Sequence, residues 1–330
     1  MIKAKKKAKA VAPLPARDGI APSRVWLAEG GWSTIGQFLV ERFPHVAEAD
    51  LRWRLARGDI VDTAGQSMAF DMPYQPHAKQ WLWYYRHVPD EVPVPFEMPI
   101  LYADDTLIVV DKPHFLASTP GGQYLQHTAL TRVRQHFDDV AISPLHRLDR
   151  ETAGILLFCR KPELRGAYQT LFQNQQVQRV YEAIAPAQPD SSIQFPLRYS
   201  SRLEQAKGQL FVEEVPGEPN SHTDIEVLKN FQDTPSEKRP MAAICLYQLR
   251  PLTGRKHQLR VHLNALGTPI LNDSYYPARP AEPQPDDYSK PLQLLARSIA
   301  FVDPVSGQQR EFVSKRQLII AGKARFSLGE

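Results

Sequence analysis

Apolar residues in the segment 32–62 recur in a pattern that predicts two short helices followed by a strand. In the first helix they follow helical spacing and share one face: Ile35, Phe38, Leu39 and Phe43. Ser33 or Thr34 suits its N-cap, and Pro44 ends it, since proline cannot continue a helix.

The second helix directs Leu51 and Leu55 inward and spreads three arginines over its more exposed faces: Arg52, Arg54 and Arg57. Gly58 is placed to end this helix before an apolar pair at residues 60–61. Arginines presented by a helix pair suit contact with RNA phosphates, and an ordinary solvated helix face explains the same pattern. Both interpretations stay open at this point.

Residues 81–85 form a strand-like aromatic stretch, Trp-Leu-Trp-Tyr-Tyr, whose rings either stack on bases or pack within a small domain. Four prolines then stiffen the chain, which indicates a linker at residues 89–99. We therefore expect a small α/β module at residues 25–88 and a larger domain at residues 100–330. Residues 1–24 are predicted to be a disordered basic tail and lead-in.

Beyond residue 100, short apolar runs with β-branched residues alternate with helical segments, the runs being residues 107–110, 155–158 and 241–249. This alternation predicts an α+β domain built on a mixed, largely antiparallel sheet. Residues 277–291 contain five prolines and several charges, so we expect a surface insertion there.

The net charge of +4 comes from the tail: residues 1–9 hold five lysines, which leaves 4 − 5 = −1 for residues 10–330. Such a tail either solubilises the chain or adds salt-sensitive attraction to phosphates. The apolar runs are too short to span a bilayer, no leader opens the chain, and Cys159 and Cys245 lie in apolar runs. We expect a cytoplasmic protein with reduced core cysteines and no membrane contact.

The first candidate for chemistry is Asp149, which lies between Arg147 and Arg150 immediately before an apolar strand. Neighbouring cations favour the ionised carboxylate, which is then available as nucleophile or base. Without further context the same residues also fit a structural Arg–Asp network.

The second candidate is the segment 253–267, in which Leu259, Leu263 and Leu266 follow helical spacing and Gly267 suits the helix end. We expect His257 and Arg260 to share another face, which would deliver a guanidinium to a carboxylate or phosphate. The spacing of the two histidines in this segment does not match a helical zinc site, so no metal is expected.

Together these segments resemble the RluA-type pseudouridine synthases. The family's His-Arg-Leu-Asp motif, with its Thr, small residue, Gly and apolar strand, matches residues 146–158. The Thr-Gly-Arg-x-His-Gln-Leu-Arg-Val-His-Leu motif matches residues 253–263, with Lys256 where Thr or Ser is usual. Flanking signatures match at residues 102–113, 179–183 and 267–276, while Leu295 replaces a usual His. The helix pair loosely resembles the αL-type RNA-binding module, although residues 62–65 replace its Asn-Gly turn.

The resemblance implies an enzyme that isomerises uridine in structured RNA, either ribosomal RNA, which is favoured, or transfer RNA, and that acts as a monomer without cofactor, metal or protein partner. It makes Asp149 the catalytic carboxylate, Arg260 its buried salt-bridge partner, and Tyr181 the ring that stacks on the flipped base. Arg147 would help to fill the space that the base vacates. The residues expected to contact RNA are His146, Arg147, Arg150, Arg255, Lys256, His257, Arg52, Arg54 and Arg57.

Two other functions fit parts of the pattern. A glycoside hydrolase would use Asp149 and Glu151 as paired carboxylates, but the flanking arginines oppose the raised pKa that its acid requires. A catalytically silent RNA-binding factor would keep the basic surface without the chemistry, and the intact set of Asp149, Tyr181 and Arg260 argues against it.

Overall fold

The computed structural model describes residues 12–75, 81–86, 91–205, 211–231, 243–278 and 285–318. The chain divides into two compact units, Met1–Glu91 and Val92–Glu330, and the division lies within the proline-rich segment 89–99. The tail lysines lie outside the described residues. Residues 12–24 make defined contacts, contrary to the disordered lead-in that we predicted: Arg17 pairs with Asp59 at 2.8 Å.

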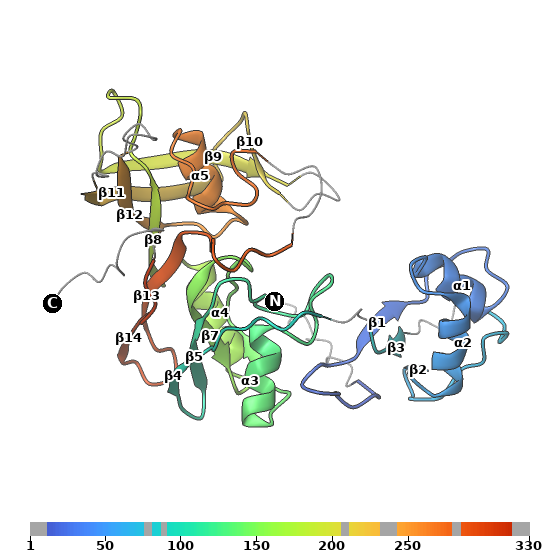
Figure 1. Cartoon of the computed structure of the whole chain (residues 1–330). Coiled ribbons are helices and arrows are strands. Elements are labelled where there is room, and N and C mark those ends of the chain that lie inside the picture. The colour runs from blue at the N-terminus through green and yellow to red at the C-terminus, as the bar shows by residue number, and fades with distance from the viewer. Residues whose placement is uncertain are drawn as a thin grey trace, which may run out of the picture. The chain divides into compact units, whose positions relative to one another are not determined.

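The first unit combines two helices with a three-stranded antiparallel sheet of order β1-β3-β2 (Figure 1). Its elements are β1 (Ser23–Trp26), α1 (Ile35–Arg42), α2 (Glu48–Ala56), β2 (Ile60–Val61) and β3 (Trp81–Tyr84). Thr34 caps α1 by accepting a hydrogen bond from the Gln37 amide, and Gly58 follows α2 with φ of +75°. The predicted helices and strands are confirmed. Strand β1 was missed, because four residues are too few for a periodic signal.

The second unit is built on an 11-stranded sheet with the path β10-β9-β11-β12-β8-β13-β7-β5-β4, to which β14 and β6 add at β13 and β7. Its strands are β4 (Ile100–Ala103), β5 (Leu107–Lys112), β6 (Ser143–Pro144), β7 (Ala153–Cys159), β8 (Gln178–Pro186), β9 (Leu197–Glu204), β10 (Glu213–Val215), β11 (Ser221–Phe231), β12 (Ile244–Pro251), β13 (Leu294–Val302) and β14 (Gln309–Val313). The helices are α3 (Ala129–Phe137), α4 (Arg165–Gln173) and α5 (Gln258–Ala265). The predicted α+β class with a largely antiparallel sheet is correct.

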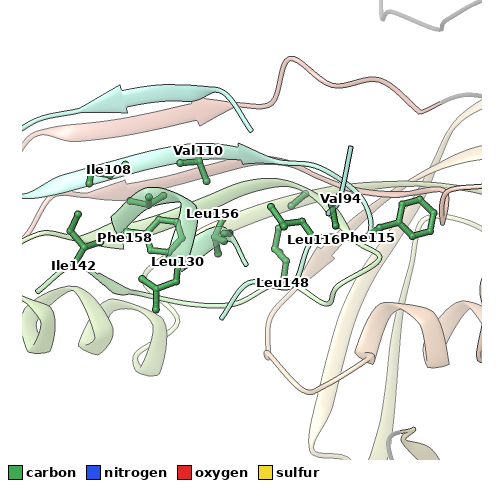
Figure 2. Packing of buried hydrophobic residues seen from close by; sticks show 13 residues of the cluster. Val94, Ile108, Val110, Phe115, Leu116, Leu130, Ile142, Leu148, Leu156 and Phe158 are labelled. Atoms are coloured by element: carbon green, nitrogen blue, oxygen red, sulfur yellow. The ribbon is translucent and has the colours of Figure 1, made fainter. Parts of the chain in front are cut away.

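Both faces of the sheet are covered around β5, because its side chains alternate between two apolar clusters. Ile108 and Val110 pack with Leu130 of α3 on one face (Figure 2). Leu107 and Val109 pack on the other face, in the cluster that contains residues of α4. Buried strands with two covered faces read as continuous apolar runs, which is why the sequence pattern located β5 and β7 well.

The described sheet has one parallel pairing, where β7 meets β13 through Ala153–Leu295 and Gly154–Ala296. Gly154 has φ of +113°, and a Cβ at this position would lie 2.2 Å from the Ala296 carbonyl oxygen. No other residue fits this backbone approach.

The segment 277–291 is more than a surface insertion, which corrects our prediction for the part that the structure describes. The ring of Tyr288 packs edge-on against Phe96 and Phe115, with centroids 5.5 and 5.1 Å away. Asp286 forms a two-pronged ion pair with Arg150. Residues 279–284 lie outside the described residues. Among the helices of the described part, none has the length and apolar character needed to cross a membrane.

Candidate active site

A cavity of about 810 Å³ opens where the loop before β7 faces β8 and the loop before α5. Asp149, Tyr181 and Arg260 all line this cavity, so the structure brings together the three residues expected to be catalytic. They come from sequence positions up to 111 residues apart, 260 − 149, and only the sheet order makes them neighbours.

The backbone around Asp149 is fixed on both sides. Its neighbour Leu148 donates its amide to the Ser118 hydroxyl at 3.0 Å, and that hydroxyl donates back to the Leu148 carbonyl at 2.6 Å. The Thr152 amide donates to the Asp149 carbonyl at 3.2 Å. The Asp149 carboxylate itself accepts no hydrogen bond from the residues that the structure describes. Hydrogen bonds therefore hold the loop in place, and the Asp149 carboxylate that it carries lines the cavity without a hydrogen-bond partner among the described residues.

Lys112 supports the same loop from inside the protein. Its side chain is fully buried, and Nζ donates to the carbonyls of Arg150, Pro113 and Leu116 at 3.1, 3.0 and 2.8 Å. Burial lowers the pKa of Lys112 well below its ordinary value, and the charge of Asp149 opposes that shift. The Lys-Pro signature contained this residue, but a lysine at the end of an apolar run gave no sign that it holds the loop of Asp149.

The expected salt bridge between Arg260 and Asp149 is not what the structure shows. Arg260 binds Asp273 through two hydrogen bonds of 2.7 and 2.6 Å and pairs with Glu151 at 2.8 Å. Among the described residues, no ion pair joins Arg260 to Asp149. A guanidinium can bind a carboxylate along an edge through two parallel hydrogen bonds, and Asp273 binds Arg260 in this way. Sequence alone could not rank three nearby carboxylates as partners.

Burial and charge act in opposite directions on Arg260, whose side chain is 1% exposed. Burial alone would lower its pKa, and the hydrogen bonds and charges of Asp273, with smaller contributions from Glu151 and Asp149, raise it above the ordinary value. Arg260 is thus a permanent cation. It influences Asp149 through space rather than by direct contact.

Tyr181 lies on β8, opposite Ala296 of β13 and Leu249 of β12. Burial raises the pKa of its hydroxyl, with Arg179 opposing and Asp149 adding to the shift. The phenol therefore stays neutral at ordinary pH and presents a ring beside the cavity.

Three of the predicted RNA contacts form a cationic wall of the cavity: Arg147, Arg255 and Lys256. Arg147 is exposed and makes no ion pair with any described residue, while the Arg255 Nε donates to the Asn220 carbonyl at 3.2 Å. Burial lowers the pKa of Lys256. The charge of Asp149 opposes this shift, and the charge of Arg147 adds to it. This wall is suited to phosphate.

Two histidines expected to contact RNA are committed to protein groups. His146 Nε2 accepts the Leu157 amide at 3.2 Å, and burial lowers the pKa of this ring to about 3. His257 precedes α5 with φ of +54°, outside the helix, so the expected helical face shared with Arg260 does not exist. Burial lowers the pKa of His257 to about 4. Both rings line the cavity as neutral groups.

Other predicted RNA contacts are already ion-paired. Arg150 binds Asp286, with both bonds at 2.7 Å. The two arginines of α2 and Arg57 at its C-cap pair with neighbouring acids, at 2.9 Å for Arg52 with Glu48, 2.9 Å for Arg54 with Asp50 and 3.6 Å for Arg57 with Asp59. Arg54 is 12% exposed, so it does not lie on an exposed face as predicted. Whether these arginines contact RNA stays a prediction.

No group of three or more His, Cys, Asp or Glu side chains within the described ranges is arranged to hold a metal ion.

Comparison with known proteins identifies relatives of the chain. A family model for RNA pseudouridylate synthase matches residues 106–265. The dual-specificity RNA pseudouridine synthase RluA of Haemophilus influenzae is 30% identical over 228 residues, which cover 66% of this chain and 93% of that protein. The tRNA pseudouridine synthase C of Pasteurella multocida is 30% identical over 223 residues, covering 64% and 88%.

One further curated protein and one solved structure also match the chain. The ribosomal large subunit pseudouridine synthase C of Rickettsia conorii is 28% identical over 220 residues, which cover 66% of this chain and 67% of that protein. A solved structure, human RNA pseudouridylate synthase domain containing 4, is 25% identical, with a TM-score of 0.47, and covers 66% of this chain and 87% of that one.

Proposed function

The chain belongs to the RluA-type RNA pseudouridine synthases, and from this premise we propose that Asp149 is the carboxylate that isomerises a flipped uridine in structured RNA. The observation that carries the proposal is an Asp149 side chain without a hydrogen-bond partner in the described structure, facing a cavity with a cationic wall. A polyanionic substrate fits such a wall better than a neutral sugar does.

The reaction breaks the bond from C1′ of ribose to N1 of uracil and makes a bond from C1′ to C5. Nothing is oxidised and no group is lost, so the chemistry requires a positioned carboxylate rather than a redox partner. The uridine first leaves its stack, at a cost of roughly a few kcal/mol. In this proposal Arg147, Arg255 and Lys256 hold phosphates, and Arg147 helps to fill the vacated space.

Asp149 then acts at the ribose as nucleophile or base. Tyr181 stacks on the everted uracil from the β8 side. Arg260 keeps Glu151 and Asp273 in place and adds a fixed positive charge near the reacting centre. Lys112 holds the loop that carries Asp149. We propose ribosomal RNA before transfer RNA as the substrate, and relatives bear names for both.

The test is Asp149→Asn in the full chain. Because the carboxylate has no partner to lose, we expect the free energy of unfolding to change by less than about 0.5 kcal/mol. Pseudouridine formation should fall by at least about 10⁴-fold, as expected when a catalytic nucleophile or base is removed. RNA affinity should be kept. Modification by the purified Asn variant at above one per cent of the wild-type rate would refute the role.

Glu151→Gln is the matched control, because it changes a second carboxylate on the same loop. Glu151 is engaged by Arg260 and by the Ser274 hydroxyl, so this variant should lose stability and retain far more activity than Asp149→Asn. A glycoside hydrolase would lose its reaction in both variants. Mapping pseudouridines in total RNA with and without the gene would identify the substrate.

A further inference from the structure

The first unit carries a row of aromatic rings outside its main apolar cluster, of which Trp83 is buried and Trp26 is exposed. Side chains alternate along β3, so Leu82 and Tyr84 face the core while Trp81, Trp83 and Tyr85 face the other way. Register places Arg24 of β1 opposite Trp83, and Trp26 opposite Trp81. We call this set the tryptophan face: Arg24, Trp26, Trp81, Trp83 and Tyr85.

Guanidinium groups lie over several of these rings. The Arg24 guanidinium is 4.2 Å from the Trp81 ring centroid and 5.4 Å from that of Trp83. Trp26 meets Trp81 edge-on at 5.0 Å, and it is 39% exposed, which is unusual for so large an apolar side chain. Arg17 extends the row, 3.7 Å above Tyr85.

The two arginines at this face differ in their partners. Arg17 pairs with Asp59 at 2.8 Å, whereas Arg24 makes no ion pair with a described residue. Each arginine of α2, in contrast, pairs with an acid. Arg24 therefore lies over the partly buried Trp81 ring, which the exposed Trp26 contacts edge-on.

We propose that the tryptophan face binds a single-stranded segment of the substrate RNA, with bases stacked on Trp26 and on the guanidinium plane of Arg24, and a phosphate contacted by Arg24. The inference rests on the proposed function only in taking RNA as the ligand. Aromatic rings and arginine planes are the usual platforms for unstacked bases, and the neighbouring guanidinium charge suits the backbone. A duplex has no free base faces and fits this surface poorly.

All five tryptophans of the chain lie in the first unit, at positions 26, 32, 53, 81 and 83, so intrinsic tryptophan fluorescence reports on this unit alone. The full-length protein is titrated with a single-stranded RNA of about twelve nucleotides, and separately with a duplex of the same length. We expect the single strand to quench the fluorescence and to bind at least tenfold more tightly than the duplex.

Trp26→Ala and Arg24→Gln should each weaken binding of the single strand about tenfold, the effect of losing one stacked base. Trp53→Ala is the matched control. Trp53 is 53% exposed and lies 4.2 Å below Arg57, but Asp59 neutralises that arginine. Trp53→Ala should change the affinity for the single strand less than twofold. Arg24→Lys keeps the charge and loses the plane, so it should fall between wild type and Arg24→Gln.

Unchanged affinity in both Trp26→Ala and Arg24→Gln would overturn the proposal, and so would equal binding of single strand and duplex. The titration requires no chemistry, so Asp149→Asn should bind as wild type does. Failure of the catalytic assignment would appear only in the modification assay, and failure of the tryptophan face only in the quenching.

Discussion

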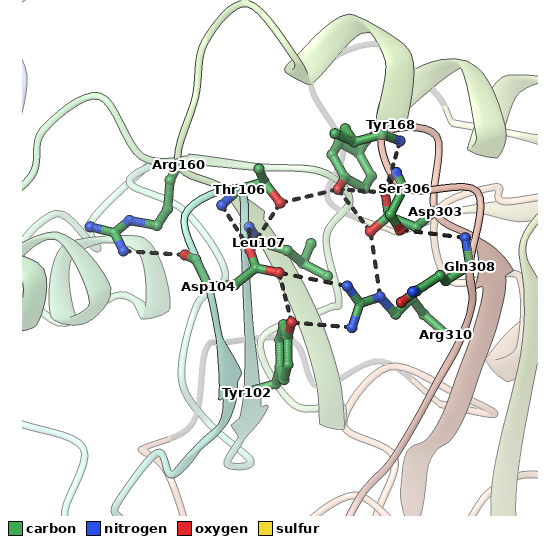
Figure 3. Close-up of polar contacts among 11 residues, drawn as sticks. Tyr102, Asp104, Thr106, Leu107, Arg160, Tyr168, Asp303, Ser306, Gln308 and Arg310 are labelled. Atoms are coloured by element: carbon green, nitrogen blue, oxygen red, sulfur yellow. Dashed lines mark hydrogen bonds and ion pairs between the residues drawn. The ribbon is translucent and has the colours of Figure 1, made fainter.

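Two polar networks of the second unit differ in the number of hydrogen bonds that their central carboxylates accept. One joins the turn between β4 and β5 to α4 and to the turn between β13 and β14 (Figure 3). There Asp104 accepts hydrogen bonds from the Tyr102 hydroxyl, the Leu107 amide, and the amide and hydroxyl of Thr106, all at 2.7–2.9 Å. Burial alone would raise the pKa of Asp104, but these hydrogen bonds lower it to about 2.

The other network surrounds the cavity. Its supporting groups are equally well bound, since Lys112 has three carbonyl partners and Arg260 two carboxylates. Asp149 alone accepts no hydrogen bond from the described residues. The first network gives the Asp104 carboxylate several hydrogen-bond donors, whereas the candidate site holds the groups around Asp149 and leaves its carboxylate without a hydrogen-bond partner among the described residues. Substitutions in the two networks should therefore separate stability from activity.

The largest expected effect is that of Arg260→Ala. It leaves Asp273 and Glu151 as buried carboxylates without their cation, which costs about 3–5 kcal/mol of unfolding free energy. Denaturant titration measures this loss. Arg260→Lys keeps the charge but not the two-edged hydrogen bonding, so it should recover only part of the stability. A loss below 1 kcal/mol in the alanine variant would contradict the proposed support of the site.

Asp104→Asn is expected to rank second. It removes the charged acceptor of four hydrogen bonds and should cost about 1.5–3 kcal/mol, with an unchanged turnover number. The folded pKa of Asp104 lies below its unfolded value, so this stabilisation is present above about pH 5 and is lost as the pH falls toward 2. The difference between variant and wild type should therefore vanish in acid. A fall in turnover would show that the two networks are coupled.

Buried histidines give the next effect. Burial lowers the pKa of His262 to about 4, and its ring nitrogens contact the hydroxyls of Ser221 and Thr223, both at 2.9 Å. Between pH 6.5 and 4 the unfolded histidine binds a proton that the folded one does not. Each unit by which the pH is lowered in this range should therefore reduce the free energy of unfolding by about 1.4 kcal/mol through this group. In His262→Gln the slope of unfolding free energy against pH should be shallower by that amount; an unchanged slope would contradict it.

The smallest effect is expected at the contact between Asp286 and Arg150, whose side chains are 26% and 24% exposed. Asp286→Asn should cost about 0.5–1 kcal/mol, because solvent screens the pair. Activity should decrease only slightly, since Lys112 still holds the Arg150 carbonyl. A loss of activity above tenfold would show that the segment 285–291 positions Asp149.

The sequence predicted the parts of the fold that depend on local pattern. Strands β5 and β7 are continuous apolar runs, and α5 has Leu259, Leu263 and Gly267 where a helix and its end require them. Strand β1 escaped because it is short, and Arg17 because its partner Asp59 lies 42 positions away, 59 − 17.

The sequence predicted which residues line the candidate site but not which of them contact one another. The motifs placed Asp149, Tyr181 and Arg260 together, and the cavity contains all three. The partner of Arg260 was wrong, because pairing depends on which carboxylate meets the edge of the guanidinium, a property of tertiary geometry. That the His146 ring is buried and neutral is likewise a property of tertiary structure, and its contact with RNA stays a prediction.

Gly154 links the reaction to the shape of the sheet. On one side of it lie β7, β5 and β4 with the loop of Asp149; on the other lie β13 and β8 with Tyr181. The glycine thus sets how closely the strand that follows the Asp149 loop approaches the strand next to Tyr181. An added methyl group would meet the Ala296 carbonyl oxygen, so the two strands would have to separate and Asp149 would move relative to Tyr181.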